Sequence, residues 1–146
     1  TPVHRVAALD HLRLHPAGVL TLPAAQLHAL AADFEQQFGV AGLRLHPLCG
    51  GFLLSGFAAL GVVAEEPARH LGARLPRALA QGEDAPALLR LAGECDLWLH
   101  EHAVNRARLA EGQLPVNGLW LWGGSADDVS LPGRPAVPVQ VRVFSD

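Results

Sequence analysis

The most restrictive feature of the sequence is the stretch NGLWLWGGS, which places two tryptophans on one short segment. The chain contains only three tryptophans, and Trp120 and Trp122 are two positions apart. Side chains alternate along a strand, so we expect a strand at residues 118–122 that carries both indoles on one face and packs them against a helix. Truncating a buried indole costs roughly 3–5 kcal/mol, so the fold has to cover that face. Gly123 and Gly124 then allow the chain to turn.

A long helix is predicted directly before this strand. Asp84, with Pro86 in the first turn, suits a helix start, whereas Gly112 and Pro115 suit its end. The apolar face repeats at helical spacing and consists of Leu88, Leu89, Leu91, Ala92, Cys95, Trp98, Leu99 and His102.

The remaining periodicity predicts a second main helix and several short strands. Thr21 is placed to cap a helix that has Pro23 in its first turn and ends at Gly39. We further predict a hairpin that turns at residues 15–18, strands within 41–48 and 51–60, a short helix entered through Pro67, and an alternating edge strand at 137–144. Paired strands with helices between them indicate an α+β fold, with an antiparallel or mixed sheet and two main helices packed on it.

Composition limits the class of protein and its compartment. The chain of 146 residues has the length of one domain, and its net charge of −3 gives no basic footprint for nucleic acid. It has neither an apolar run of membrane-spanning length nor an N-terminal leader, so we expect a cytoplasmic protein without a membrane partner. Cys49 and Cys95 are expected to be small buried apolar residues in a reducing compartment. The first residue is Thr1, which indicates a chain that is processed, trimmed or seen in part.

The segment LHEHAVNRARLAEGQLPVNGLWLWGG resembles a motif of a known family. It is similar to the inserted domain of archaeal-type cofactor-independent phosphoglycerate mutases. It is more similar still to stand-alone bacterial proteins of the regulatory protein RpfE type, which resemble that insertion. The matching positions are His102, Val104, Asn105, Arg108, Gly112, Pro115, Asn117, Leu119, Trp120, Trp122, Gly123 and Gly124.

The resemblance is specific over residues 84–124 and departs from the family pattern at three places. Ala103 stands where proline is favoured, Gly118 where the small bacterial proteins tend to have serine, and Ser125 where a third glycine is usual. The resemblance implies that residues 1–146 form a single domain without the catalytic metal-binding core of the mutases. It also implies a regulatory protein with a phosphorylated ligand as one candidate partner.

The motif residues allow a structural and a functional interpretation. Asn105 and Arg108 share a helix face, and Asn117 begins the next strand, so their side chains are placed to bond stray backbone groups in the turn. Trp120, Trp122 and Trp98 are the structural aromatic residues of this unit. In the functional interpretation, a concave run of backbone N–H groups binds a small anion, and an arginine fork lies at its rim. The candidate ligand-binding residues are then Asn105, Arg108, Asn117, Gly123, Gly124 and Ser125, with Arg106 nearby.

We expect no catalytic residue, metal or cofactor in this chain. None of the serines stands in a G-x-S-x-G turn. Asp96 and His100 are four residues apart and suit one metal, but a surface acid–histidine pair is the commoner outcome. His46 near Cys49 has the spacing of a base and a nucleophile, but the glycines that follow favour a turn.

Three functions remain open from the sequence. The favoured one is a non-catalytic binding or regulatory domain related to the phosphoglycerate mutase insertion, with a small phosphorylated or anionic ligand. The first alternative is a phosphoryl-transfer enzyme of phosphoglycerate mutase type. The second is a homo-oligomeric interaction module, a homodimer or an accessory to a protein partner, which the alternating valines at 137–144 favour because an unpaired strand can extend another sheet.

Overall fold

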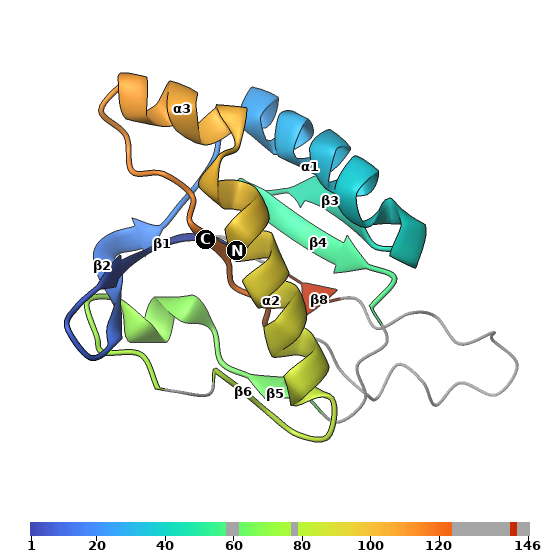
Figure 1. The fold of residues 1–146 in the computed structure, drawn as a ribbon. Coiled ribbons are helices and arrows are strands. Elements are labelled where there is room, and N and C mark those ends of the chain that lie inside the picture. Colours follow the sequence, from blue (N-terminus) through green and yellow to red (C-terminus); the bar gives the residue numbers. More distant parts are fainter. Residues whose placement is uncertain (58–61, 77–78, 124–140, 143–146) are drawn as a thin grey trace, which may run out of the picture.

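The computed structural model describes residues 1–57, 62–76, 79–123 and 141–142, and these form an α+β fold (Figure 1). The described α-helices are α1 (Ala24–Phe38), α2 (Ala85–His100) and α3 (Ala103–Ala110). The strands are β1 (Pro2–Ala7), β2 (Leu12–Val19), β3 (Arg44–Leu48), β4 (Gly51–Ser55), β5 (Val63–Ala64), β6 (Ala80–Gln81), β7 (Gly118–Leu119) and β8 (Val141–Arg142). Short 3-10 turns lie at η1 (Gly39–Ala41) and η2 (Pro67–His70). The predicted fold class is confirmed, and every pair of named strands among the described residues is antiparallel.

The first sheet has β1 at its centre, between β2 and β7. The predicted turn at residues 15–18 is wrong, because β2 continues through these residues and the hairpin turn lies between β1 and β2. The register shifts between Val3 and Arg5 of β1, so residues 15–18 bulge from a continuous strand. Pro16 has no N–H to donate, so it belongs where the ladder is broken. Gly18 fits there because a Cβ would collide with the His4 carbonyl oxygen.

The second sheet, in the order β3-β4-β8, packs with α1 and α2 in the larger of the two core clusters. The predicted helix is confirmed, but it begins at Ala24 with Pro23 as its N-terminal cap residue, and Thr21 does not cap it. The buried face of α1 consists of Leu27, Leu30, Phe34 and Phe38.

The β3–β4 hairpin confirms the two strands predicted around the Cys49–Gly50 turn. Cys49 and Gly50 have φ of 48° and 79°, the left-handed backbone of a tight hairpin turn. Cys49 is exposed, so its predicted burial is wrong, whereas Cys95 on α2 is buried. Burial, followed by the negative charges of Asp96 and Glu94, raises the pKa of the Cys95 thiol to about 12.

The predicted edge strand at 137–144 lies mostly outside the described residues. Its described part, β8, pairs with β4 through Leu53 opposite Arg142 and Leu54 opposite Val141. Within the described residues β8 is therefore an outer strand of its sheet.

The single long helix predicted over residues 84–112 is wrong, because the chain breaks into α2 and α3 around His102. The backbone of His102 is extended, with φ −67° and ψ 140°, and its ring Nδ1 accepts the N–H of Val104 at 3.0 Å. His102 thus caps α3 instead of continuing the apolar face of α2. Ala103 is the first residue of α3, a position that proline favours, so the proline expected from the resemblance would also fit there.

Both indoles of the tryptophan stretch pack in one cluster, but its other members lie on β1, on β2 and in the segment before β6 rather than on a helix. Trp120 is 5% exposed and packs with Val3, Leu14 and Leu75, and the partly buried Trp122 joins the same cluster. The strand β7 is shorter than predicted. The backbone N–H of Trp120, just after β7, still donates to the carbonyl oxygen of Thr1 at 2.8 Å.

Trp98 lies elsewhere, in the main core. Its ring meets those of Phe34 and Phe38 edge to face, with centroids 5.7 and 5.9 Å apart. The three tryptophans are therefore divided between the two clusters. Trp98 packs α2 against α1.

The two clustered tryptophans should differ in their effect on stability. Trp120→Ala empties a buried site and is expected to lower the free energy of unfolding by about 3–5 kcal/mol. Trp122→Ala, the matched control, removes a partly exposed ring and should cost less. Urea denaturation of both variants measures the order, and a larger loss for Trp122→Ala would contradict this packing.

Candidate functional site

The side chain of Asn105 joins three segments of the chain. Asn105 is on α3 and is 5% exposed. Its Nδ2 donates to the carbonyl oxygens of Leu99 and Val116 at 2.8 and 2.7 Å, and its Oδ1 accepts the Val116 N–H at 2.7 Å. One amide therefore bridges the end of α2, α3 and the segment that leads into β7.

Arg108 ties α3 both to the following turn and to α1. Its guanidinium is buried, and Nε donates to the Leu114 carbonyl oxygen at 2.8 Å. Nη1 donates to Oε1 of Gln26 on α1, also at 2.8 Å. Burial lowers the pKa of Arg108, and the nearby Glu111 opposes this shift.

His102 makes a second connection to α1. Its Nε2 lies 2.7 Å from Oδ2 of Asp33. Because Nδ1 accepts the Val104 N–H, the hydrogen of the neutral ring sits on Nε2 and is donated to Asp33. The motif histidine and arginine thus hold α3 against α1, as the adjacent positions of the two helices in Figure 1 show.

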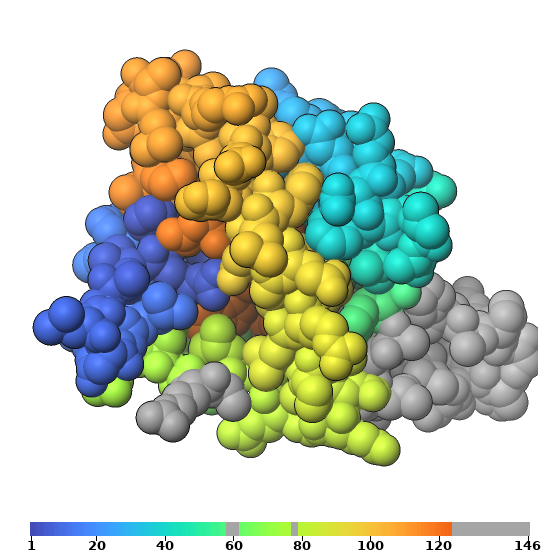
Figure 2. All heavy atoms as spheres, in the orientation of Figure 1, coloured from blue at the N-terminus to red at the C-terminus, as the bar shows by residue number. Residues whose placement is uncertain are grey.

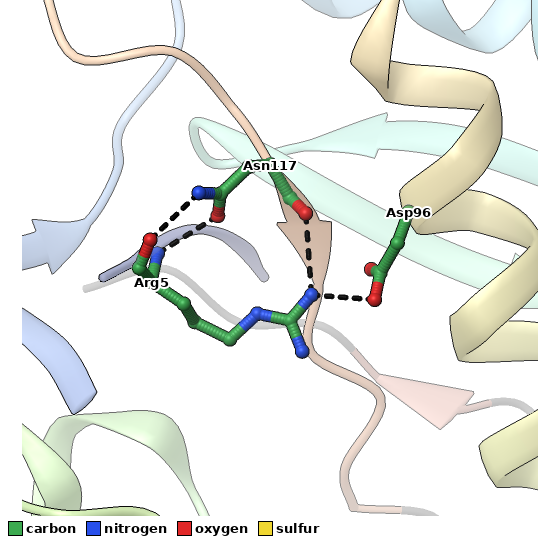
Figure 3. Close-up of polar contacts among 3 residues, drawn as sticks. All are labelled: Arg5, Asp96 and Asn117. Carbon is green, nitrogen blue, oxygen red and sulfur yellow. Dashed lines mark hydrogen bonds and ion pairs between the residues drawn. The ribbon is translucent and has the colours of Figure 1, made fainter. Parts of the chain in front are cut away.

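Asn117 places Arg5 of β1 next to α2 (Figure 3). The Arg5 N–H donates to Oδ1 of Asn117 at 2.8 Å, and Nδ2 of Asn117 donates to the Arg5 carbonyl oxygen at 2.7 Å. Arg5 Nη2 then donates to the Asn117 carbonyl oxygen at 3.2 Å and forms an ion pair with Oδ2 of Asp96 at 2.6 Å. The backbone and the side chain of Arg5 are both fixed by the residue that precedes β7.

Gly118 provides the space that the Arg5 guanidinium occupies. A Cβ at Gly118 would lie 2.7 Å from Nη2 of Arg5 and 3.0 Å from its Cζ. A serine at this position, which the resemblance leads us to expect, would require the guanidinium to move. The departure noted in the sequence matches a local arrangement centred on Arg5.

The ion pair between Arg5 and Asp96 is incomplete. Nε of Arg5 and Oδ1 of Asp96 are buried without a hydrogen-bond partner. Burial raises the pKa of the Asp96 carboxyl, and the bond to Arg5 and its charge offset only part of that shift. One charged contact thus does not replace the water that this carboxylate has lost.

The structure gives the sequence-predicted ligand residues different settings. Asn105, Arg108 and Asn117 bond to the backbone of the surrounding turns, as the structural interpretation expects. Gly123 has a φ of 74°, the left-handed backbone that glycine favours, while Gly124 and Ser125 lie outside the described residues. Anion binding by this group stays a prediction. Sequence reasoning missed Arg5, which no periodicity or spacing connects to the motif.

The other candidate pairs are separated or differently bonded. Asp96 pairs with Arg5 and not with His100. Nε2 of His46 bonds to Oγ of Ser55 at 2.8 Å, between the paired strands β3 and β4. Among the described residues, no group of three or more His, Cys, Asp and Glu side chains is placed to hold a metal ion. In the same part of the chain, no helix has the length and apolar character needed to cross a bilayer.

Comparison with known proteins finds partial similarity to phosphoglycerate mutases. The chain is 36% identical over 63 residues, 43% of its length, to the probable 2,3-bisphosphoglycerate-independent phosphoglycerate mutase of Geobacter sulfurreducens. It is 36% identical over 61 residues, 42% of its length, to the 2,3-bisphosphoglycerate-independent phosphoglycerate mutase of Methanothrix thermoacetophila. The aligned stretch is 16% of each mutase. These matches support a relation between this α+β chain and a segment of those enzymes.

The remaining comparisons add no family. The chain is 27% identical over 124 residues to a component of the linear gramicidin synthase of Brevibacillus parabrevis, but that stretch is 2% of the synthase chain. No protein-family profile and no solved structure matches the sequence.

Removal of the Asn105 amide should destabilise the fold. In Asn105→Ala the buried N–H and carbonyl of Val116 lose their partner, and we expect the free energy of unfolding to fall by about 2–4 kcal/mol. The exposed Arg106 on the same helix is the matched control, since Arg106→Ala should change stability by less than about 0.5 kcal/mol. Urea denaturation tests this, and equal stability of the two variants would show that the amide is dispensable.

Asp96 should make the protein less stable as the pH rises. Its pKa is higher in the folded chain than the usual unfolded value of about 3.9, so the folded state binds the proton more tightly. This contribution to stability is present at low pH and is lost as the pH rises through the folded pKa. Asp96→Asn should therefore gain stability relative to the natural sequence between about pH 4 and 7.

Asp10 serves as the control for that experiment, because its pKa is shifted in the opposite direction to that of Asp96. A bond from His11 lowers the pKa of Asp10, so its contribution is present above the usual value and is lost as the pH falls. Denaturation series at several pH values compare the two asparagine variants. A relative stability of Asp96→Asn that does not change with pH would contradict the assignment of Asp96.

Proposed function

We propose that this chain is a non-catalytic binding and regulatory domain of the RpfE type, related to the inserted segment of phosphoglycerate mutase, and that it binds a small phosphorylated or otherwise anionic ligand. The proposal treats residues 1–146 as one domain that functions without the catalytic core of the mutases. Its main support is that the side chains of the motif form hydrogen bonds within the fold.

That motif works as a scaffold. The donors and the acceptor of the buried Asn105 amide are all bonded to backbone groups. Both ring nitrogens of His102 are also bonded, one to the Val104 N–H and the other to Asp33. Side chains committed in this way hold elements together and do not reach a substrate. In this chain the motif therefore packs α3 and does not supply reacting groups.

An anionic ligand is proposed from the relatives and from Arg108. Phosphoglycerates, which the names of the related mutases specify, are anions. Nη1 of Arg108 donates to Gln26, a neutral acceptor. A phosphate or carboxylate oxygen would accept a charge-assisted bond of roughly twice that strength, so an anion that reaches Nη1 competes with Gln26 for this donor. The proposed rim has Arg108 at its centre, with Gly123, Gly124 and Ser125 as the other predicted ligand residues, whereas Asn105 and Asn117 support it by holding the neighbouring backbone.

A ligand screen with two variants tests the proposal. 3-Phosphoglycerate or inorganic phosphate, at 100 times its dissociation constant, should stabilise the fold by about 2.7 kcal/mol in thermal denaturation. Gln26→Ala removes the competing acceptor and should tighten binding several-fold. Arg106→Gln changes an exposed arginine of the same helix and is the control that should leave binding unchanged.

Two results would overturn this function. The first is turnover of phosphoglycerate by the purified chain with added Mn²⁺ or Mg²⁺, which would make it an enzyme. The second is the absence of stabilisation by any anion in the screen, with Gln26→Ala behaving like the natural sequence.

A further inference from the structure

A groove separate from the motif rim lies between the β1–β2 hairpin and α2. In Figure 2 the surface is hollowed between the hairpin, in blue, and α2, in yellow. The groove has a volume of about 750 Å³. Its charged walls are formed by Arg5, Asp10, Arg74 and Asp96, and Leu12, Leu89 and Ala92 are among its apolar lining residues.

The charges of the groove are balanced and arranged in pairs. Arg5 and Asp96 form the tighter pair, at 2.6 Å, with side chains 17% and 33% exposed. Arg74 and Asp10 form a looser pair, at 3.7 Å, with side chains 61% and 71% exposed. A small dianion in this groove meets two carboxylates as well as two guanidiniums. A ligand that carries one charge of each sign instead finds a complement for each end.

The carboxylate of Asp96 is the end that needs a donor. Its Oδ1 is buried without a hydrogen-bond partner, and the ion pair with Arg5 does not offset the cost of its burial. A small local shift that brings a ligand ammonium to this carboxylate would supply both a hydrogen bond and a second positive charge.

Arg74 is suited to hold the opposite end of the ligand. Its 3.7 Å contact with Asp10 is longer than a hydrogen bond, and the guanidinium is mostly exposed. A ligand carboxylate therefore gains a bidentate contact with Arg74 at the expense of a weak surface pair.

The apolar wall adds a third requirement. Leu12 on β2 and Leu89 on α2 line the groove and are 44% and 36% exposed. The charged groups of the groove can bind the two charged ends of a ligand, so these leucines are left to contact its apolar part. An apolar ligand group that covers these two side chains removes their surface from water, which favours binding.

We propose that this groove binds a small zwitterion with an apolar side chain, of the class of the α-amino acids, with its ammonium at Asp96 and its carboxylate at Arg74. Asn117 and Gly118 act as positioning residues, because they hold the Arg5 guanidinium beside Asp96. Apart from Asn117, the site uses different side chains from the Arg108 rim, and it does not depend on the phosphate ligand proposed for that rim.

Titration of the isotope-labelled protein with L-leucine and L-phenylalanine, followed by NMR, tests the proposal. We expect chemical-shift changes at the amides of Gly93 and Arg74, which line the groove. 4-Methylpentanoate lacks the ammonium and 3-methylbutylamine lacks the carboxylate, so each should bind at least about 10-fold more weakly than leucine. This factor corresponds to the loss of about 1.4 kcal/mol.

Variants assign the two ends of the ligand. Asp96→Asn and Arg74→Gln should each weaken leucine binding by about 10-fold or more, and Asp96→Asn should abolish the advantage of leucine over 4-methylpentanoate. Glu94→Gln on α2 and Arg13→Gln on β2 change exposed residues outside the groove and are the matched controls.

The outcomes separate this site from the proposed function. The groove proposal fails if neither amino acid shifts the groove amides, or if Asp96→Asn binds leucine as well as the natural sequence does. It also fails if 3-phosphoglycerate shifts the groove amides at lower concentration than the amino acids. Shifts by 3-phosphoglycerate around Arg108 alone, with leucine active in the groove, would support both sites independently.

Discussion

The buried amide of Asn105 is the contact on which the rest of the structure depends. It fixes Val116, and the next two residues of the chain then pair with β1. Asn117 bonds both backbone groups of Arg5, and Gly118 lies opposite Val3. The position of the first sheet relative to α2 therefore follows from one polar side chain on α3.

The same segment explains why two of the three tryptophans stand so close together. Once β7 is placed beside β1, Trp120 points into the cluster formed with Val3 and Leu14. Its Nε1 donates to the Glu65 carbonyl oxygen at 2.8 Å, and its ring packs against that of His70 with centroids 5.4 Å apart. His70 also lines the groove. The tryptophan stretch thus supports one wall of the groove from behind.

Much of the fold could be predicted because it follows from local patterns. The helical spacing of Leu27, Leu30 and Phe34 defines α1, and the Cys49–Gly50 turn defines the β3–β4 hairpin. The break between α2 and α3 could not be predicted from periodicity. His102 fits an apolar face by its spacing, and only the extended backbone shows that its ring caps α3.

The site could be predicted less completely than the fold, for a reason of sequence distance. Asn105 and Arg108 can be identified as residues that bond a turn, since they share a helix face close to that turn. The contact between Arg5 and Asn117 joins residues 112 positions apart, so no local pattern reveals it. The only trace in the sequence is Gly118, whose missing side chain gives space to Arg5.

Amide hydrogen exchange at Val116 is the most direct test of the central role of Asn105. Val116 lies outside any helix or strand, and its N–H is bonded to the Asn105 side chain. We predict that this N–H exchanges as slowly as the amides in the interior of α2, with an opening free energy close to that of global unfolding. Exchange as fast as that of exposed surface loops would contradict the central role of Asn105.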